Sequence, residues 1–477
     1  MNNLERLGDL VSSRLLKLGF RTPRRSVVRE LLECVYLATL RTEEARFVQG
    51  SITFADPRTP DLDPPITRRL AYPSFTSFAA RLPLTVENLV KLSRTIDNWS
   101  GSIAVYGTRR SNLVAWGLLD QLVHSNVRLH GEGRSGPSLP GILTIVMDGI
   151  GALSVYHGVL FIGGLRQDRL VIREHDVLHS ALVANRVLHY MRPIARSISK
   201  VLGGSITPNN VEIFLFGEFA TTLARICIGL RRIGTGGALL ITPRPAAHLL
   251  DVLHRIPYMR LGHSSLLSVL DSVYLSDKKT EVLRHSPNGE IPARLVRDQY
   301  LAEADARDRD DEVTGAIKVV TSLAAVDGLV LLTPLLEVVG FGVKILSGSA
   351  ACTVYDGPSF IRRGIAATRV DTSRFGTRHN SMLRYCRADS NAVGIIVSQD
   401  GQVRVVLSIG RSLTLWDNVQ LLSYVSDLRW YARLRQGRLA YRRSRRRLAH
   451  LGYTAMPKTL EALMSITRTK NSGPGLV

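Results

Sequence analysis

Apolar residues recur at intervals of three and four in two segments near the N-terminus, residues 1–18 and residues 25–44. This spacing puts the apolar side chains on one face of a helix and predicts two amphipathic helices, the first ended by Gly19. Strand-like segments follow within residues 101–165, separated by glycine-containing turns. This part of the chain therefore predicts an α+β module. From about residue 170 to 202 the pattern is helical, which indicates a connector.

Helical and strand-like segments alternate from residue 207 onward. Residues 218–233 form an apolar helical pattern that Gly234 ends, and the sequence GGALLITP after it predicts a short buried strand. Helical spacing also occurs in residues 249–256 (LLDVLHRI) and 266–275. These segments predict helices on both sides of the first strand.

The alternation continues with a helical pattern at residues 313–326 and two strand patterns around a turn at residues 327–345. A helix is predicted from about Asn380 to Arg387, and Asp400-Gly401 is a hairpin turn signal. Mixed strands with helices between them predict an α/β fold, α+β overall, with a layered mixed sheet. We predict the following parts: an N-terminal helix at 1–29, an α+β module at 30–170, a helical connector at 171–206, a layered α/β domain at 207–415 and a basic helical extension with a tail at 416–477.

The composition is that of a globular protein, because 45% of the 477 residues are hydrophobic and 21% are charged. The net charge of +22 favours phosphate-bearing partners, although a genome-wide arginine bias would also produce it. Four scattered cysteines without a C-x-x-C pair argue against disulfides and structural zinc, and predict a cytoplasmic protein. No run of about 18 uncharged apolar residues occurs, so we predict no membrane span.

The sequence Gly376-Thr377-Arg378-His379 stands directly before a predicted helix. Thr377 is a suitable N-cap, and the first amides of a helix point outward without intrahelical partners. Arg378 can add a charge-assisted fork and His379 a further donor, so the cluster can bind a phosphate. A capped helix whose Arg378 forms a surface ion pair is the alternative.

Two acidic turns are further candidates. Asp327 precedes Gly328 where a predicted helix meets a strand, and its carboxylate could hold Mg²⁺ or accept a proton from a sugar hydroxyl. Ser398 and Asp400 could both face a ligand at the hairpin turn. An ordinary turn is the alternative at both sites. The chain has no G-x-x-x-x-G-K-[ST] loop, which excludes a P-loop NTPase.

Two other features have weaker chemical meaning. His175 and His179 have the i, i+4 spacing of a helical metal site, or of an ordinary helix face. The arginine-rich segment after Val425, with interleaved Trp430 and Tyr431, could bind a nucleic-acid backbone, an acidic membrane surface or a partner protein.

The order of these motifs resembles the diadenylate cyclase (DAC) domain of cyclic-di-AMP synthases, over roughly residues 207–415. A helix leads to GTGGALLITP, Asp327-Gly328 precedes a strand, GTRHN opens a helix, and NAVGIIVSQDG forms a hairpin. The module upstream, from about residue 30 to 170, resembles the sensor-like region called DACNV.

The chain departs from the DAC motifs at three places. Asp327-Gly328-Leu329 stands for the family's D-G-A, and Arg378-His379-Asn380 stands for its R-H-R. Ser398-Gln399-Asp400 stands for its Ser-Glu-Glu and keeps an acid at the last position. These departures make the fold and nucleotide binding safer expectations than turnover.

The resemblance implies condensation of two ATP to cyclic di-AMP with Mg²⁺ or Mn²⁺, by two DAC domains that associate face to face. It implies that Asp327, Arg378 and His379 act in catalysis and that Asp327 and Asp400 hold the metal. Residues that match the family's nucleotide-binding positions are Gly328, Leu329, Gly376, Thr377, Asn380 and Ser398. A catalytically degraded nucleotide sensor is the alternative, and a nucleic-acid-binding protein acting through its C-terminal helix is the third interpretation.

Overall fold

The structure is a computed structural model, which describes the residue ranges given below. Asp400 and the predicted arginine-rich helix lie outside these ranges. The chain folds into two compact units, one built mainly from Met1–His175 with the hairpin turn Ser398–Gln402, and the other mainly from Asp176–Val397 and Val403–Leu421. The described residues are 3–20, 22–43, 46–58, 74–96, 101–107, 112–120, 142–157, 160–166, 168–201, 207–285, 292–346, 353–399 and 401–421.

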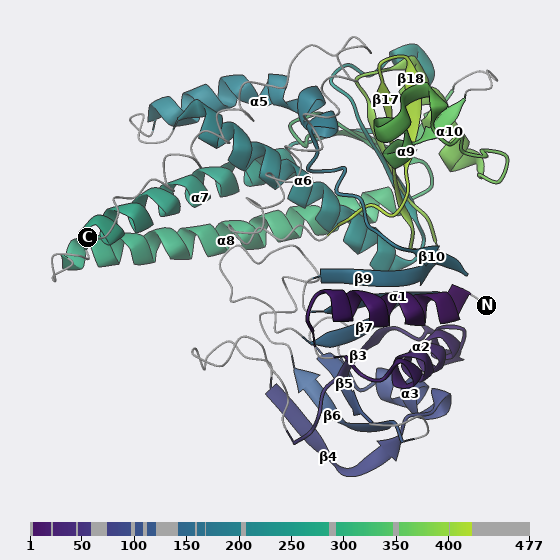
Figure 1. Cartoon of the computed structure of the whole chain (residues 1–477). Coiled ribbons are helices and arrows are strands. Elements are labelled where there is room, and N and C mark those ends of the chain that lie inside the picture. The colour runs from purple at the N-terminus through teal and green to yellow at the C-terminus, as the bar shows by residue number, and fades with distance from the viewer. Residues whose placement is uncertain are drawn as a thin grey trace, which may run out of the picture. The chain divides into compact units, whose positions relative to one another are not determined.

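The first unit is an eight-stranded sheet with three helices packed on one face (Figure 1). Its strand order is β10-β9-β8-β7-β3-β5-β6-β4, and only the β3–β5 pair is parallel. The helices are α1 (Asn3–Lys17), α2 (Arg25–Thr39) and α3 (Val86–Ser93), and the strands of the sheet are β3 (Gly50–Phe54), β4 (Ser74–Pro83), β5 (Gly101–Tyr106), β6 (Val114–Asp120), β7 (Leu143–Gly149), β8 (Ala152–His157), β9 (Leu160–Arg166) and β10 (Arg169–Val171).

The core of this unit lies between the helices and the sheet. Leu7 and Val11 of α1 and Leu31 of α2 are buried in one cluster with Ile103 and Ile145 of the sheet. A separate ribbon, β1 (Thr42–Glu43) with β2 (Arg46–Phe47), follows α2. The two N-terminal helices that the apolar spacing predicts are therefore confirmed, and they belong to the core of the β module.

The second unit is a second eight-stranded sheet, in the order β12-β14-β13-β11-β16-β17-β18-β15. The β11–β13 and β15–β18 pairs are parallel and the others are antiparallel. Its strands are β11 (Gly237–Ile241), β12 (Leu250–Tyr258), β13 (Leu329–Leu332), β14 (Val338–Ile345), β15 (Val354–Asp356), β16 (Val393–Val397), β17 (Val403–Ile409) and β18 (Ser412–Trp416).

Helices cover both faces of this sheet, and close contacts at two glycines identify which helices lie on which face. A Cβ on Gly237 would meet Leu230 of α6 and the Ala324 carbonyl at the end of α8. A Cβ on Gly394 would meet Met382 of α10. Since these glycines point to opposite faces, α6 and α8 cover one face and α10 the other. The helices are α5 (Ala181–Val201), α6 (Pro208–Ile233), α7 (Arg260–His285), α8 (Ala293–Ala324), α9 (Gly357–Arg363) and α10 (Thr377–Ala388), with short 3₁₀ turns at Ala247–Leu249 and Gly364–Ala366.

The layered α/β architecture agrees with the fold class that the sequence predicts. One predicted helix, residues 249–256, is instead part of the edge strand β12, which pairs with β14 from Leu250↔Ile345 to Tyr258↔Val338. The local apolar spacing fits a helix, but pairing with a neighbouring strand overrides it. A second correction concerns the helix predicted at residues 313–326: α8 begins at Ala293 and so also includes the acidic stretch at residues 303–312.

Helix α6 meets the length and hydropathy of a membrane span over Pro208–Arg231, the one described helix to do so. Buried helices of globular folds meet the same criteria, and 61% of its most apolar 18-residue window is buried within the fold. Glu218 and Arg225 on this helix are also buried. The expectation that the chain has no membrane-span candidate is therefore revised, because α6 meets the criteria of length and hydropathy. Its burial is that of a core helix.

Three buried thiols give a prediction for the fold. Burial raises the pKa of Cys34, Cys227 and Cys386 to about 12 from an ordinary value of 9.0. We expect these thiols to resist Ellman's reagent at pH 8 in a Cys352→Ser protein and to react once denaturant is added, because the thiolate is the nucleophile.

The same shift predicts how stability depends on pH. The folded state holds these protons more tightly than the unfolded state, so their contribution is complete below pH 9 and is lost as the pH rises towards about 12. If the folded protein reacted with Ellman's reagent at the rate of a free cysteine, the raised pKa values on which both predictions rest would be contradicted.

Candidate functional site

One edge of the second sheet collects most of the motifs found in the sequence. The parallel strands β11 and β13 both begin there, and the antiparallel strand β16 ends there, since Gly237 lies opposite Val397. Gly236 precedes β11, Asp327-Gly328 precedes β13, and Ser398 follows β16. Strand pairing thus brings together segments that are about 70 to 90 residues apart in sequence.

Asp327 and Gly328 form a tight turn at the entrance to β13. The Asp327 side chain is 97% exposed, and one of its oxygens, Oδ1, accepts a hydrogen bond of 3.0 Å from the Gly328 amide. Gly328 has φ +101°, and a Cβ there would lie 2.7 Å from the carbonyl carbon of Gly342. A side chain at residue 328 would therefore be strained and would push β13 away from β14. This turn presents the carboxylate of Asp327 to solvent.

Leu329, the third residue of this motif, points away from solvent. Its exposure is 5%, and it belongs to the apolar cluster beneath α10. The larger side chain at this position is accommodated in the core.

Helix α10 brings its first turn to the same edge. Gly376 is the N-cap, with extended dihedral angles of −69° and 176°, and its carbonyl accepts a 3.2 Å hydrogen bond from the Asn380 amide. The predicted N-cap, Thr377, is instead the first helical residue, and the helix begins three residues before the predicted start. The Arg378 guanidinium, through Nη2, lies 3.9 Å from Oδ1 of Asp327. A cation and a carboxylate from two different motifs therefore face each other at this edge.

His379 is held between an aromatic ring and a guanidinium. Its ring stacks on Phe375 at 5.0 Å between centroids, and its Nε2 lies 2.9 Å from Nη1 of Arg404. Arginine can only donate, so Nε2 of His379 accepts and the ring is the neutral tautomer protonated at Nδ1. Nδ1 thus carries the ring proton.

Arg404 belongs to a buried ion pair behind the edge. Its Nε donates to Oδ1 of Asp417 at 2.6 Å, its side chain is 9% exposed, and its guanidinium lies 5.4 Å from the Phe375 ring centroid. Sequence reasoning missed Phe375, Arg404 and Asp417. The detectable signal was an arginine inside VRVVLSI, a strand whose other residues are apolar or small, because a charge in such a strand needs a partner.

Asn380 and Ser398 have local backbone partners. Asn380 Nδ2 donates to the Phe375 carbonyl at 2.7 Å and so closes the loop before α10. At the β16–β17 hairpin, the Ser398 amide donates to the Gln402 carbonyl, and Gly401 has φ +76°. The predicted hairpin is confirmed by the antiparallel pairing of its strands, and Asp400 lies outside the described residues.

The other end of α10 is fixed at the far end of β11. Thr242, directly after β11, donates from Oγ1 to Oδ2 of Asp389 at 2.7 Å, and Oη of Tyr385 accepts from the Ala246 amide at 3.2 Å. Burial raises the pKa of the Tyr385 hydroxyl, so it stays protonated as a neutral acceptor. Contacts at both ends therefore fix the position of the first turn of α10 along the sheet.

The helical spacing of His175 and His179, on which both the metal site and the ordinary helix face depended, is wrong. Residues 176–180 are not helical, because α5 begins at Ala181. His179 instead pairs through Nδ1 with Oδ1 of Asp176 at 2.8 Å. Within the described residues, no group of three or more His, Cys, Asp or Glu side chains could hold a metal ion.

Comparison with known families identifies part of the first unit. Residues 20–120 match the family model described as "Probable sensor domain DACNV". The matched residues run from just before α2 to the end of β6. This match supports the sensor assignment of the N-terminal module. No curated protein and no solved structure matches the chain.

Gly328 provides a direct test of the turn that presents Asp327. We expect Gly328→Ala to lower the free energy of unfolding by about 1–3 kcal/mol, because alanine is strained at this φ and would contact the backbone of Gly342. Urea denaturation measures the change.

Gly315→Ala is the matched control for this substitution. Gly315 lies inside α8 with open space around its Cβ position, so alanine should stabilise the protein by about 0.5–1 kcal/mol. Equal small effects at both glycines would mean that the turn at Gly328 is not under steric constraint.

Proposed function

We propose that residues 207–415 bind ATP with Mg²⁺ or Mn²⁺ and condense two ATP molecules to cyclic di-AMP, under control of the N-terminal sensor domain. The observation that carries this proposal is the distance of 3.9 Å between the guanidinium of Arg378 and the carboxylate of Asp327. These residues come from the two motifs by which the chain resembles diadenylate cyclase domains, 51 residues apart in sequence. Strand pairing and the position of α10 bring the two motifs to the same end of the sheet.

The first turn of α10 would bind the phosphates of ATP. Its outward amides and the partial positive charge of the helix terminus favour an anion, and Arg378 adds a charged donor. His379, whose ring is fixed by Phe375 and Arg404, would donate from Nδ1. The buried guanidinium of Arg404 lies directly behind that ring and adds positive charge to the same edge.

Asp327 is the described residue suited to a divalent cation here. Its carboxylate is 97% exposed, and Mg²⁺ is commonly held by one or two carboxylates, water and substrate phosphates. A cluster of three protein ligands is therefore not required. A bound Mg²⁺ or Mn²⁺ would neutralise charge on the triphosphate.

The proposed reaction proceeds by positioning and charge neutralisation. The 3′-oxygen of each ATP attacks the α-phosphorus of the other, a P–O bond forms, the bond to the β-phosphate oxygen breaks, and pyrophosphate leaves. The hydroxyl proton passes to a base, for which the exposed carboxylate of Asp327 is available. A single edge holds one ATP, so closure of the ring requires two copies of the domain to associate with these edges facing each other.

A nucleotide sensor without turnover is the second candidate, and Asn380 favours it. The family has a cation at this position, whereas here the amide of Asn380 is turned back onto the Phe375 carbonyl. Leu329 is weaker support for the sensor candidate, because its side chain is buried in the core and lies away from the exposed edge. Both candidates require nucleotide binding at the same residues and differ only in turnover.

Arg378→Ala should weaken ATP binding by about 1.5–3 kcal/mol, the usual contribution of a hydrogen bond to a charged group. Isothermal titration calorimetry with ATP and Mg²⁺ measures this loss. Arg387→Ala, in the last turn of the same helix, is the control and should bind ATP like the unchanged protein. An unchanged affinity in Arg378→Ala would remove α10 from the proposed site.

Asp327→Asn should abolish cyclic di-AMP formation while ATP binding without metal and the unfolding midpoint change little, because it removes a charge and almost no volume. Asp251→Asn, at an exposed acid on β12, is the control. Chromatography of reactions with ATP and Mg²⁺ or Mn²⁺ measures the product. Asn380→Arg, which restores the family's cation, should increase the yield.

The two candidate functions give different results in this assay. If the unchanged protein and Asn380→Arg both bind ATP but make no cyclic di-AMP with either metal, the sensor function replaces the cyclase.

A further inference from the structure

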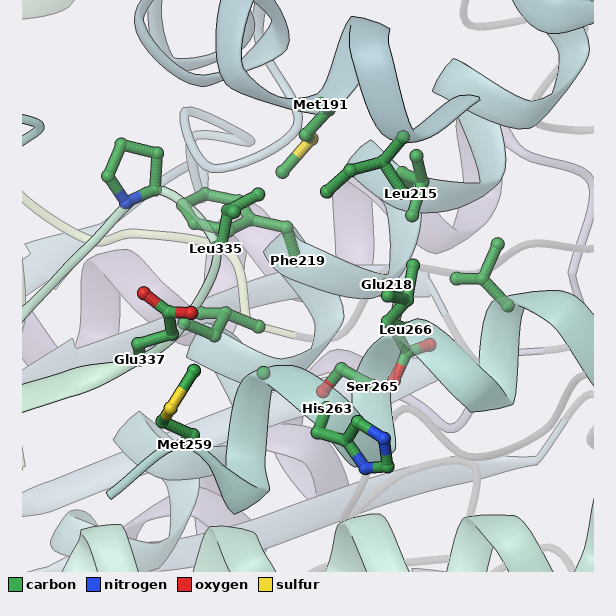
Figure 2. A pocket seen from close by; sticks show the side chains of 15 residues that line it. Met191, Leu215, Glu218, Phe219, Met259, His263, Ser265, Leu266, Leu335 and Glu337 are labelled. Carbon is green, nitrogen blue, oxygen red and sulfur yellow. The ribbon is translucent and has the colours of Figure 1, made fainter. Parts of the chain in front are cut away.

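A cavity of about 160 Å³ lies in the helical layer of the second unit (Figure 2). Helices α5, α6 and α7 and the turn between β13 and β14 enclose it. Its walls are mostly apolar and include Met191, Leu215, Phe219, Leu266 and Leu335. An apolar cavity of about 150 Å³ is large enough to hold benzene, so this one has room for a small organic molecule.

Two buried polar side chains interrupt these apolar walls. Glu218 of α6 is 4% exposed, and Ser265 of α7 is also 4% exposed. The hydroxyl of Ser265 has no hydrogen-bond partner among the described residues. In Figure 2, Glu218, Ser265 and His263 gather on one side of the cavity, and Glu337 lies on the other. A buried hydroxyl without a partner costs free energy unless a bound molecule or water satisfies it.

The turn that forms one wall is conformationally strained. Leu336 has φ +64°, a left-handed conformation that branched apolar residues rarely adopt. Backbone hydrogen bonds hold it there, from the Thr333 amide to the Glu337 carbonyl at 2.9 Å and from the Leu336 amide to the Thr333 carbonyl at 3.0 Å. Such strain persists where the surroundings fix it, and it occurs frequently beside ligands.

The polar groups around the cavity are mainly hydrogen-bond acceptors. Glu218 and Glu337 provide two carboxyl groups, which accept from Thr222 and Thr333 at 3.4 Å, and Ser265 and His263 add groups that can also accept hydrogen bonds. His263 and Met259 are exposed and lie at the opening. The interior therefore combines apolar contact with attraction for a cationic donor, and it disfavours a carboxylate.

We propose that this cavity binds a small apolar amine, with the ammonium group between Glu218 and Ser265 and the hydrocarbon against Phe219, Leu215 and Met191. This site is separate from the edge that carries Asp327, because its wall lies at the opposite end of β13. The proposal does not depend on nucleotide binding or on the cyclase reaction.

Three probes of one shape test the proposal on the full chain: benzylamine, benzyl alcohol and benzoate. Isothermal titration calorimetry should find benzylamine bound at least about tenfold more tightly than benzoate, with benzyl alcohol between them, as expected for a charged hydrogen bond to a buried carboxylate. Benzylamine should also raise the unfolding temperature.

Matched variants identify the site of binding. Glu218→Gln should weaken the binding of benzylamine by about tenfold or more and leave the affinity for benzyl alcohol nearly unchanged. Only the ammonium group depends on a carboxylate at residue 218. Glu212→Gln is the control, since Glu212 is a buried acid on the same helix, 6% exposed, that does not line the cavity. Ser265→Leu should fill the cavity and abolish binding of all three probes.

The proposal is overturned if benzylamine does not bind the unchanged protein at millimolar concentration, or if benzoate binds equally well. Equal losses in Glu212→Gln and Glu218→Gln would overturn it as well. Should Glu218→Gln fail to fold, the order of the three probes on the unchanged protein and their loss in Ser265→Leu still decide the question.

Discussion

The packing of α10 onto the second sheet is the interaction on which the candidate site depends. Met382, Leu383, Tyr385 and Cys386 are fully or almost fully buried against the strands, and each large apolar side chain contributes about 1.5–3 kcal/mol when buried. Gly394 lets the helix approach, because a Cβ there would lie 2.5 Å from Met382. The helix can therefore occupy only one position along the sheet, and its first turn reaches the edge where Asp327 lies.

A partly buried group of interacting side chains, centred on Arg404, supports this edge. Asp417 holds Arg404, Arg404 donates to His379, and Phe375 stacks on the His379 ring. The stacking on Phe375 restricts the ring, and the hydrogen bond from Arg404 sets its tautomer before any ligand binds. Side chains ordered in this way lose little conformational entropy when a ligand binds.

Strand β13 lies between two different chemical environments. Its first residue follows the exposed Asp327 turn, and its last residue leads into the strained turn that lines the cavity. Helices α5, α6 and α7 thus line a mostly apolar pocket that is open on one side, whereas the α10 face ends at the exposed Asp327 turn. The fold therefore separates an exposed edge with charged side chains from a mostly apolar pocket at the opposite end of β13.

The sequence by itself determined the fold class, the two N-terminal helices, the hairpin after Val397 and the turns that could carry chemistry. These features are encoded by neighbouring residues, through apolar spacing and through glycine next to aspartate. The match of residues 20–120 to the DACNV sensor domain likewise agrees with the resemblance that the sequence suggested.

Tertiary structure decided what local sequence could not specify. LLDVLHRI has the spacing of a helix but is mostly strand, because β14 offers it backbone partners. His179 turns to Asp176 because the chain there is not helical, and Arg404 reaches His379 from 25 residues away. The meeting of Arg378 with Asp327 also depends on strand pairing and on the burial of α10. The Arg404–His379 and Arg378–Asp327 contacts and the β12–β14 pairing join residues distant in sequence, and only the packing of the whole sheet brings them together.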